Sequence, residues 1–219
     1  MLARWITPFH RANGHWITDI TPHLPVLFTT GEFLNFTMNT WLTSGHWVVT
    51  LNVYLIRQSF LNARIPWMSN KAPDSAYPSM LPSSWKCLYS SYDHFDSRYN
   101  ENRTLLFNIS TSDADAVQLV AIITGHGNDE YGCGEFCPTS HVFIVNGNDS
   151  NSVSFGSAGT LFGCTRKVSS GGIPNEAGTW IYGRNGWCDG SAVPPWTWDV
   201  SSQVKAFLFA RTAQHSHPI

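Results

Sequence analysis

Short strand-like runs separated by turn-forming residues are the feature that most constrains how this chain can fold. Windows that repeat apolar residues at the helical spacing of three and four are scarce, whereas residues 47–56 are β-branched and aromatic with partial alternation. Similar runs occur at residues 104–109, 117–123, 141–145 and 204–209. Gly, Asn, Ser and Pro are frequent between these runs. The pattern predicts an all-β fold, either a sandwich or a barrel.

The strand pattern lapses between Asn62 and Tyr92. This stretch is dense in proline, as expected of a linker or a long surface connection. A length of 219 residues allows one large domain or parts of two. We therefore place a partial amino-terminal domain at residues 1–62, a connection at 63–92 and a carboxy-terminal domain at 93–219, with the candidate site in the last of these.

Charge and aromatic content narrow the classes of partner. Charged residues make up only 13% of the chain and the formal net charge is -2, so we expect no nucleic-acid partner and no binding to an acidic membrane surface. Ten tryptophans contribute to an aromatic content of 14%. Aromatic rings of this number suit a β-rich core and also the flat platforms on which sugar rings stack.

The cysteines indicate an oxidising compartment. They are Cys87, Cys133, Cys137, Cys164 and Cys188, and none of the spacings is the paired C-x-x-C of a zinc ribbon. We interpret them as disulfide-forming residues.

Signals of secretion are mixed. Sequons begin at Asn35, Asn102, Asn108 and Asn148, about the number that chance gives. The amino terminus has no apolar signal core, and no stretch approaches the roughly 20 apolar residues of a membrane helix. We expect an extracellular or secretory-pathway glycoprotein whose signal peptide is not part of this chain, and no membrane span.

The densest polar loop lies between residues 122 and 141, where a strand-like run opens before the next begins. Cys133 and Cys137 bracket Glu135, and a disulfide between them would close a small ring that limits the motion of this glutamate. A carboxylate held in this way suits acid–base chemistry, and desolvation beside Phe136 would favour its proton-donating form. The alternative is an ordinary exposed loop glutamate.

A second cluster lies between Gly178 and Pro194, where Cys188 could pair with Cys164. Arg184 offers a planar fork of donors and Trp187 an aromatic face. These two chemical types grip a hydroxylated ring by hydrogen bonds and stacking.

Metal and nucleophile signals are absent from the sequence pattern. The histidines considered as ligands are His126, His141, His215 and His217, and none has a metal-ligand spacing. His141 falls on a predicted strand and is interpreted as a core histidine. No G-x-S-x-G elbow occurs, and Cys87 has no evident histidine partner. We expect no metal and no cofactor.

Several motifs, in order and spacing, resemble the peptide-N-glycosidase F family. They are Ile123-Thr-Gly-His-Gly, Cys133-Gly-Glu-Phe-Cys137, Thr139-Ser-His141, Leu161-Phe-Gly-Cys164 and the stretch from Gly178 to Pro194. Upstream, Arg4-Trp-Ile-Thr-Pro, Ile17-Thr-Asp-Ile-Thr and Thr40-Trp-Leu-Thr-Ser-Gly are similar to the later half of that family's amino-terminal domain.

The resemblance implies two antiparallel eight-stranded jelly rolls that bind a glycan between them. This chain would hold one nearly complete jelly-roll sandwich preceded by part of a second. The family cleaves the amide between N-acetylglucosamine and asparagine without a metal. Glu135 matches a family active-site carboxylate, Arg184 and Trp187 match glycan-contacting residues, and Trp41 matches a cleft tryptophan. We expect Cys133 to pair with Cys137 and Cys164 with Cys188, which leaves Cys87 free.

The chain also departs from the family pattern. Nothing in it matches the principal catalytic aspartate, and Asn39 replaces a glutamate with an amide that exchanges no proton. His126 and Phe136 stand where the family has tryptophans, and the chain ends one or two strands after Val200. Asn39 and His126 join the expected substrate-binding residues.

Three functions follow from these observations. The first is an amidase for N-glycoproteins, or the greater part of one, which we expect to be inactive as this isolated chain. The second is a module that binds N-glycans or glycoproteins, or serves a structural role, without catalysis. The third is a β-sandwich interaction domain. Open sheet edges would also allow association through strands supplied by another chain.

Overall fold

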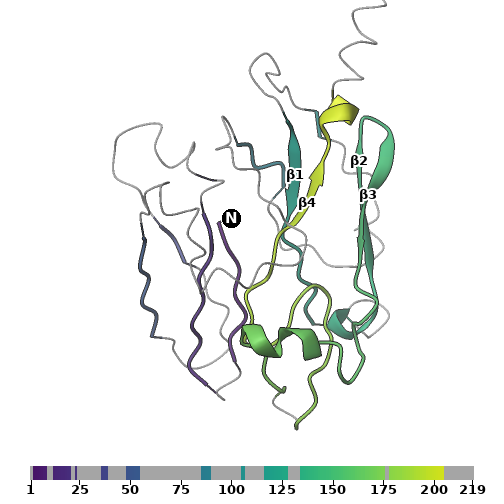
Figure 1. The fold of residues 1–219 in the computed structure, drawn as a ribbon. Helices are drawn as coiled ribbons and strands as arrows, with labels where there is room; N and C mark the ends of the chain where they lie inside the picture. The colour runs from purple at the N-terminus through teal and green to yellow at the C-terminus, as the bar shows by residue number, and fades with distance from the viewer. Residues whose placement is uncertain are drawn as a thin grey trace, which may run out of the picture.

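The computed structural model describes residues 2–8, 12–20, 23, 36–38, 48–54, 85–89, 105–106, 116–127, 134–175 and 178–204. Regular structure within these ranges is mainly β-strand, with two short 3₁₀ helices and a helical turn at residues 201–204. Figure 1 shows the strands as two pairs, β1 with β4 and β2 with β3. The all-β class is therefore confirmed for the described residues, whereas the jelly-roll topology stays a prediction. No helix in these ranges is long and apolar enough to cross a membrane.

Strands β1 (Gln118–Ala121) and β4 (Trp196–Asp199) form an antiparallel pair. The ladder extends one step further, because the Val200 amide donates to the Val117 carbonyl at 2.9 Å. β1 lies within the run predicted at residues 117–123. β4 is a strand that the sequence pattern does not predict.

Strands β2 (Ser140–Val145) and β3 (Asn148–Ser154) form an antiparallel hairpin. The turn between them contains Asn146 and Gly147, with φ angles of 50° and 83°. Positive φ at both central residues defines a type I′ turn, which Asn-Gly favours and which matches the twist of the strands. β2 covers the run predicted at residues 141–145.

Aromatic side chains connect the two strand pairs. Phe143 of β2 lies 5.2 Å from Trp198 of β4, centroid to centroid, and Phe155 lies 6.0 Å from Trp196. These contacts place the β2–β3 hairpin beside β4, as Figure 1 shows. Hydrogen bonds between Gln203, shortly after β4, and Asn151 of β3 add a second link between the two ladders.

The interpretation of His141 as a core histidine is confirmed. Its side chain lies on β2 and is only 4% exposed. Its Nε2 lies 3.2 Å from the Thr139 hydroxyl oxygen, and its ring lies 5.6 Å from that of Phe155. Burial lowers the pKa of His141, because a charged ring would lose its hydration in this position.

The segment at residues 2–8 packs against residues 191–193. Trp5 forms an antiparallel bridge with Ala192, and the Ile6 amide donates to the carbonyl of Ser191 at 3.1 Å. The beginning of the chain therefore pairs with backbone that belongs to the second predicted cluster, between Gly178 and Pro194.

A small hydrophobic cluster and one tryptophan secure this contact. The cluster consists of Ile6, Trp187 and Val193, with Ile122 packed against it. Trp16 adds a hydrogen bond from its indole nitrogen to the Gly190 carbonyl at 3.0 Å. The amino-terminal segment therefore covers one side of the loop that carries Trp187.

The strand expected over residues 47–56 does not form at residues 48–54. Val48 there is 92% exposed. A β-branched run becomes a strand only when another backbone pairs with it, and no described segment does so here. Residues 105–106 are not in a strand either, and Val204 lies in the helical turn; the remainder of these two runs lies outside the described residues.

The disulfide between Cys164 and Cys188 is confirmed, with Cα atoms 5.9 Å apart. Cys87 is exposed and free, as predicted. Cys137 is in a disulfide, but its expected partner Cys133 lies outside the described residues. The Cys164–Cys188 bond joins the Trp187 loop to the loop before η6 (Thr165–Ser170).

Replacing Cys164 and Cys188 together by alanine is expected to lower the free energy of unfolding by about 3 kcal/mol. The bond spans 24 positions, and its loss frees that loop in the unfolded chain. Urea unfolding of oxidised protein measures the change, with Cys87→Ser as the control. Equal stability of the two variants would contradict the expectation.

Candidate functional site

Glu135 lies in η5 (Gly134–Phe136), a single 3₁₀ turn directly before the disulfide-bonded Cys137. Its amide donates to the Gly127 carbonyl at 2.9 Å, and its carbonyl accepts from the Asn185 amide at 3.0 Å. These two bonds fix the turn between two other loops. The Glu135 side chain is 15% exposed, so the carboxylate keeps some access to solvent.

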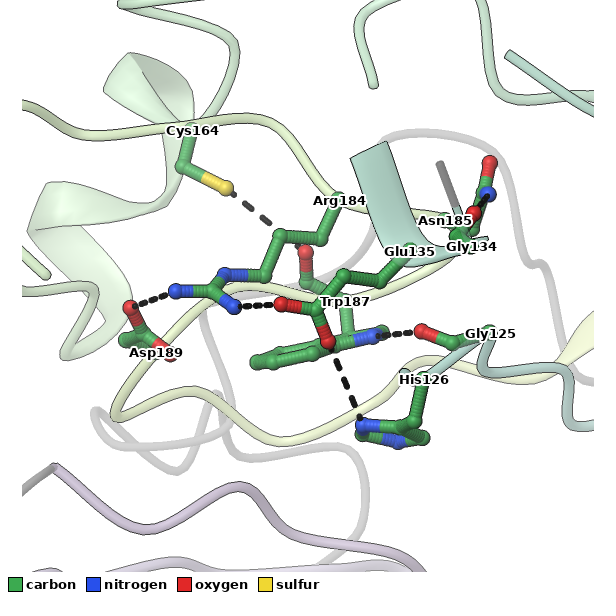
Figure 2. Close-up of polar contacts among 9 residues, drawn as sticks. All are labelled: Gly125, His126, Gly134, Glu135, Cys164, Arg184, Asn185, Trp187 and Asp189. Carbon is green, nitrogen blue, oxygen red and sulfur yellow. Dashed lines mark hydrogen bonds and ion pairs between the residues drawn. The ribbon is translucent and has the colours of Figure 1, made fainter. Parts of the chain in front are cut away.

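The guanidinium of Arg184 lies between two carboxylates, as Figure 2 shows. Nη1 donates to Glu135 Oε1, and Nη2 donates to Asp189 Oδ2 at 3.1 Å. The side chains of Arg184 and Asp189 are each only 4% exposed. A cation this deeply buried needs paired anions, because an uncompensated charge is strongly destabilising. The charge-assisted bond to Arg184 also favours the ionised form of Glu135.

Two aromatic rings hold the guanidinium. The Cζ atom of Arg184 lies 4.5 Å from the Trp187 ring centroid and 4.9 Å from that of Phe136. The indole nitrogen of Trp187 donates to the Gly125 carbonyl at 2.6 Å. Because guanidinium and aromatic faces attract each other, these rings restrict the plane in which Arg184 meets Glu135.

Asn185 joins three backbone segments and is fully buried, with no exposed surface. Its carbonyl accepts from the Gly125 amide at 2.8 Å, and its side-chain amide donates to the Gly134 carbonyl at 2.9 Å. Its side-chain oxygen accepts from the Thr139 hydroxyl at 3.1 Å. With the bond to the Glu135 carbonyl, Asn185 holds both the Gly125 loop and the η5 turn in place.

Gly186 is required by the backbone between Arg184 and Trp187. Its φ angle is 83°, and a Cβ atom there would overlap the Ile123 carbonyl oxygen. Only glycine adopts this conformation at such close approach without strain. The loop can therefore present Arg184 and Trp187 to the same side.

His126 stacks on Trp187, with ring centroids 4.5 Å apart and an interplanar angle of 28°. Its Nδ1 lies 3.9 Å from Glu135 Oε2. Desolvation, followed by the charges of Arg4 and Arg184, lowers the pKa of His126 to about 4. A carboxylate at this distance favours a charged ring, but desolvation is the largest effect and the pKa of His126 is lowered. His126 is therefore neutral at neutral pH.

The structure brings most of the predicted site residues together. Glu135, His126, Arg184 and Trp187 form one contact network, whereas Asn39 and Trp41 lie outside the described residues. Arg184 and Trp187 are 5% and 6% exposed, so a ligand would reach little of either side chain. Glu135 and His126, with side chains 15% and 26% exposed, are the accessible members.

The sequence interpretation missed Asp189, Asn185 and Arg4. Asp189 directly follows Cys188, and its place in the same loop as Arg184 is a signal that could have identified it as the partner of the arginine. Asn185 gives no such signal, because an asparagine before glycine is typical of a turn. Arg4 acts on His126 from the amino-terminal segment, far from His126 in the sequence.

The described residues contain no group of three or more His, Cys, Asp and Glu side chains that could hold a metal ion. The carboxylates of Glu135 and Asp189 both face Arg184. The arrangement is suited to hydrogen bonding and proton transfer by the chain's own side chains.

Asn185→Ala is expected to lower the free energy of unfolding by about 2–4 kcal/mol. The substitution leaves the buried Gly134 carbonyl without its partner, at about 1–3 kcal/mol for an unsatisfied group, and removes the bond of the Thr139 hydroxyl to Asn185, worth about 1 kcal/mol. Denaturant unfolding measures the loss. Asn148→Ala, at an exposed asparagine with a local bond to the Ser150 amide, is the control and should change stability by less than about 1 kcal/mol. Similar losses for both variants would show that Asn185 has no special role.

Acidification is expected to destabilise the protein partly through His126. Its pKa is about 4 in the folded state and 6.5 in the unfolded state, so the unfolded chain binds more protons between these values. Stability contributed by neutral His126 is complete above pH 6.5 and is lost as pH falls toward 4. At pH 4.5 the loss is about 2–3 kcal/mol.

The test compares unfolding free energies at pH 7 and pH 4.5 for the unmodified protein and His126→Gln. The variant should lose about 2–3 kcal/mol less than the unmodified protein. His23 and His141, whose pKa values are also lowered, are present in both proteins and cancel in the comparison. An equal loss in both proteins would contradict a His126 that is neutral in the folded state.

Comparison with known proteins places this network within a family. The family described as peptide-N-glycosidase F, C terminal, matches residues 92–218. No curated protein and no solved structure matches the chain significantly. The matched region covers more than half of the chain and includes Glu135, Arg184, Asn185 and Asp189. The chain therefore belongs to the family of peptide-N-glycosidase F carboxy-terminal domains.

Proposed function

We propose that the chain binds asparagine-linked N-acetylglucosamine at Glu135 and that this site serves hydrolysis of the amide between that sugar and asparagine. One observation carries the proposal. A partly exposed carboxylate is held by a buried arginine inside the region that matches the family. Membership of that family supports a glycan-related role.

The ionised Glu135 would act as a proton acceptor. In amide hydrolysis, a water oxygen attacks the asparagine side-chain carbonyl and the bond from carbonyl carbon to nitrogen breaks. Glu135 would take a proton from that water and return it to the departing nitrogen, which gives an aspartate and an amino sugar. Arg184 stabilises the charge of Glu135 before the reaction and fixes the direction of its carboxylate.

The exposed groups around Glu135 would orient the sugar. His126 offers a neutral ring beside the carboxylate, and Phe136 offers a face that is partly exposed. Arg184 and Trp187 are buried, so they would mainly hold Glu135, His126 and Phe136 in position and would touch the sugar little. We propose that Asn39 and Trp41 add contacts from the amino-terminal part of the chain.

The finer architecture belongs to the same proposal. We propose two jelly rolls, of which residues 93–219 form one and residues 1–62 part of the other, with a Cys133–Cys137 disulfide beside Glu135. The contact of residues 2–8 with residues 191–193 supports a packed arrangement of the two. The Cys164–Cys188 disulfide supports an extracellular or secretory location.

A second candidate is a glycan-binding module without catalysis. Asp189 is buried against Arg184, so Glu135 is the carboxylate that this network leaves partly accessible among the described residues. Family members are expected to use more than one acid, and Asn39 supplies an amide instead. On this second candidate, release of glycan by the chain is slow or undetectable while binding persists.

Binding of a glycoasparagine probe tests the site. The probe is N-acetylglucosamine linked to asparagine, titrated calorimetrically into the purified chain. Glu135→Gln is expected to weaken binding at least tenfold, since hydrogen bonds to a charged group contribute about 1.5–3 kcal/mol. Asp19→Asn, which neutralises an exposed carboxylate elsewhere, is the control and should leave the affinity unchanged.

Release of glycan from a denatured glycoprotein, followed by mass spectrometry, separates the two candidates. Release that disappears in Glu135→Gln supports the amidase, and binding without release supports the binding module. Circular dichroism of each variant establishes that it is folded. Failure of the unmodified chain to bind the probe would contradict both functions.

A further inference from the structure

A row of aromatic side chains continues from Arg184 toward the surface. Alternation of side chains along an extended segment puts Trp180, Tyr182 and Arg184 on one side of the backbone of residues 180–184. The residues between them, Ile181 and Gly183, bond to the loop at residues 159–164; the Ile181 amide donates to the Leu161 carbonyl at 3.0 Å and the Gly183 amide to the Thr160 carbonyl at 3.0 Å. These bonds keep the segment extended, and every second side chain of an extended segment lies on the same side of the backbone.

Two phenylalanines complete this row. Phe136 meets Tyr182 edge to face, with centroids 5.9 Å apart and an interplanar angle of 73°. Phe162 meets Trp180 in the same way, at 5.9 Å and 68°. We call these four side chains the aromatic row. Its inner end touches the Arg184 guanidinium through Phe136, and its outer end is Phe162.

The outer part of the row is exposed. Trp180 is 42% exposed and Phe162 is 60% exposed, whereas Trp187 at the inner site is buried. In an edge-to-face pair each ring is only partly covered by its partner, so aromatic surface remains exposed to solvent. Two large aromatic residues in contact on a surface mark an interaction site more often than single exposed side chains do.

Close backbone contacts hold the row in place. The Cβ position of Gly159 would overlap the Phe136 carbonyl oxygen, and that of Gly163 would lie 2.6 Å from the Gly183 Cα. Glycines at these points let the 159–164 loop lie directly against η5 and the 180–184 segment. The rings are therefore presented on a preformed surface and need little ordering when a ligand binds.

We propose that the aromatic row is a second carbohydrate subsite, which stacks against sugars of the oligosaccharide beyond the one held at Glu135. The inference rests on the proposed function, since the row is continuous with that site through Phe136 and Arg184. Sugar rings present C–H faces that pack on aromatic rings, and their hydroxyl rims stay in solvent. A row of rings leading away from a sugar site therefore fits a linear oligosaccharide.

Two saccharides of different length test the inference in the full chain. The short probe is the disaccharide N,N′-diacetylchitobiose, and the long probe is the core pentasaccharide of N-glycans. Calorimetry should give tighter binding of the long probe. Phe162→Ala combined with Trp180→Ala should weaken the long probe about tenfold and leave the short probe unchanged. Phe162→Ala alone, at the most exposed ring, should give a smaller loss.

Tyr54→Ala is the matched control, because Tyr54 is an aromatic residue that is 75% exposed elsewhere on the chain. It should affect neither probe. If the disaccharide binds and the double variant binds both probes normally, the second subsite is wrong and the proposed function stands. If neither probe binds the unmodified chain, the proposed function fails and the subsite fails with it. Self-association that the double variant abolishes, without any effect on the pentasaccharide, would assign the row to a second copy of the chain instead.

Discussion

The buried guanidinium of Arg184 is the constraint on which the candidate site depends. A permanent positive charge with 5% exposure is tolerated only where anions and hydrogen-bond acceptors surround it. Glu135 arrives from the η5 turn and Asp189 from the same loop as the arginine, and both pair with it. The fold must therefore hold two separate loops at hydrogen-bond distance. Trp187 and Phe136 then limit the remaining freedom of the guanidinium plane.

Hydrogen bonds to the backbone fix the positions of the loops that carry Arg184 and Glu135. Asn185 follows Arg184 directly, so the bonds that it makes to Gly125, Gly134 and Glu135 locate the arginine as well. Residues 2–8 act from the other side, where Ile6 packs on Trp187. The site thus combines stretches from the beginning, middle and end of the described chain. Removing any one of them would expose part of the ion pair to water and weaken it.

Local sequence pattern predicts part of this arrangement and misses the rest for physical reasons. The apolar and β-branched runs of β1 and β2 are visible in the sequence, and the pairing of Cys164 with Cys188 follows from the family resemblance. β3 is not, because its inward positions include Asn151, a buried polar residue that bonds to the Phe143 carbonyl and to Gln203. Residues 48–54 have strand propensity without a described partner. Asn185 is equally hidden, since its role arises from three loops that meet only after folding.

The environment of Glu135 changes the chemistry expected from its loop. A glutamate beside aromatic rings alone would tend to hold its proton, whereas the contact with Arg184 favours the ionised carboxylate. His126, neutral through desolvation, adds no positive charge in front of it. The accessible surface therefore presents a hydrogen-bond acceptor next to an uncharged ring. Sugar hydroxyls and the acetamido N–H are hydrogen-bond donors, so the proposed N-acetylated sugar carries donors for this acceptor.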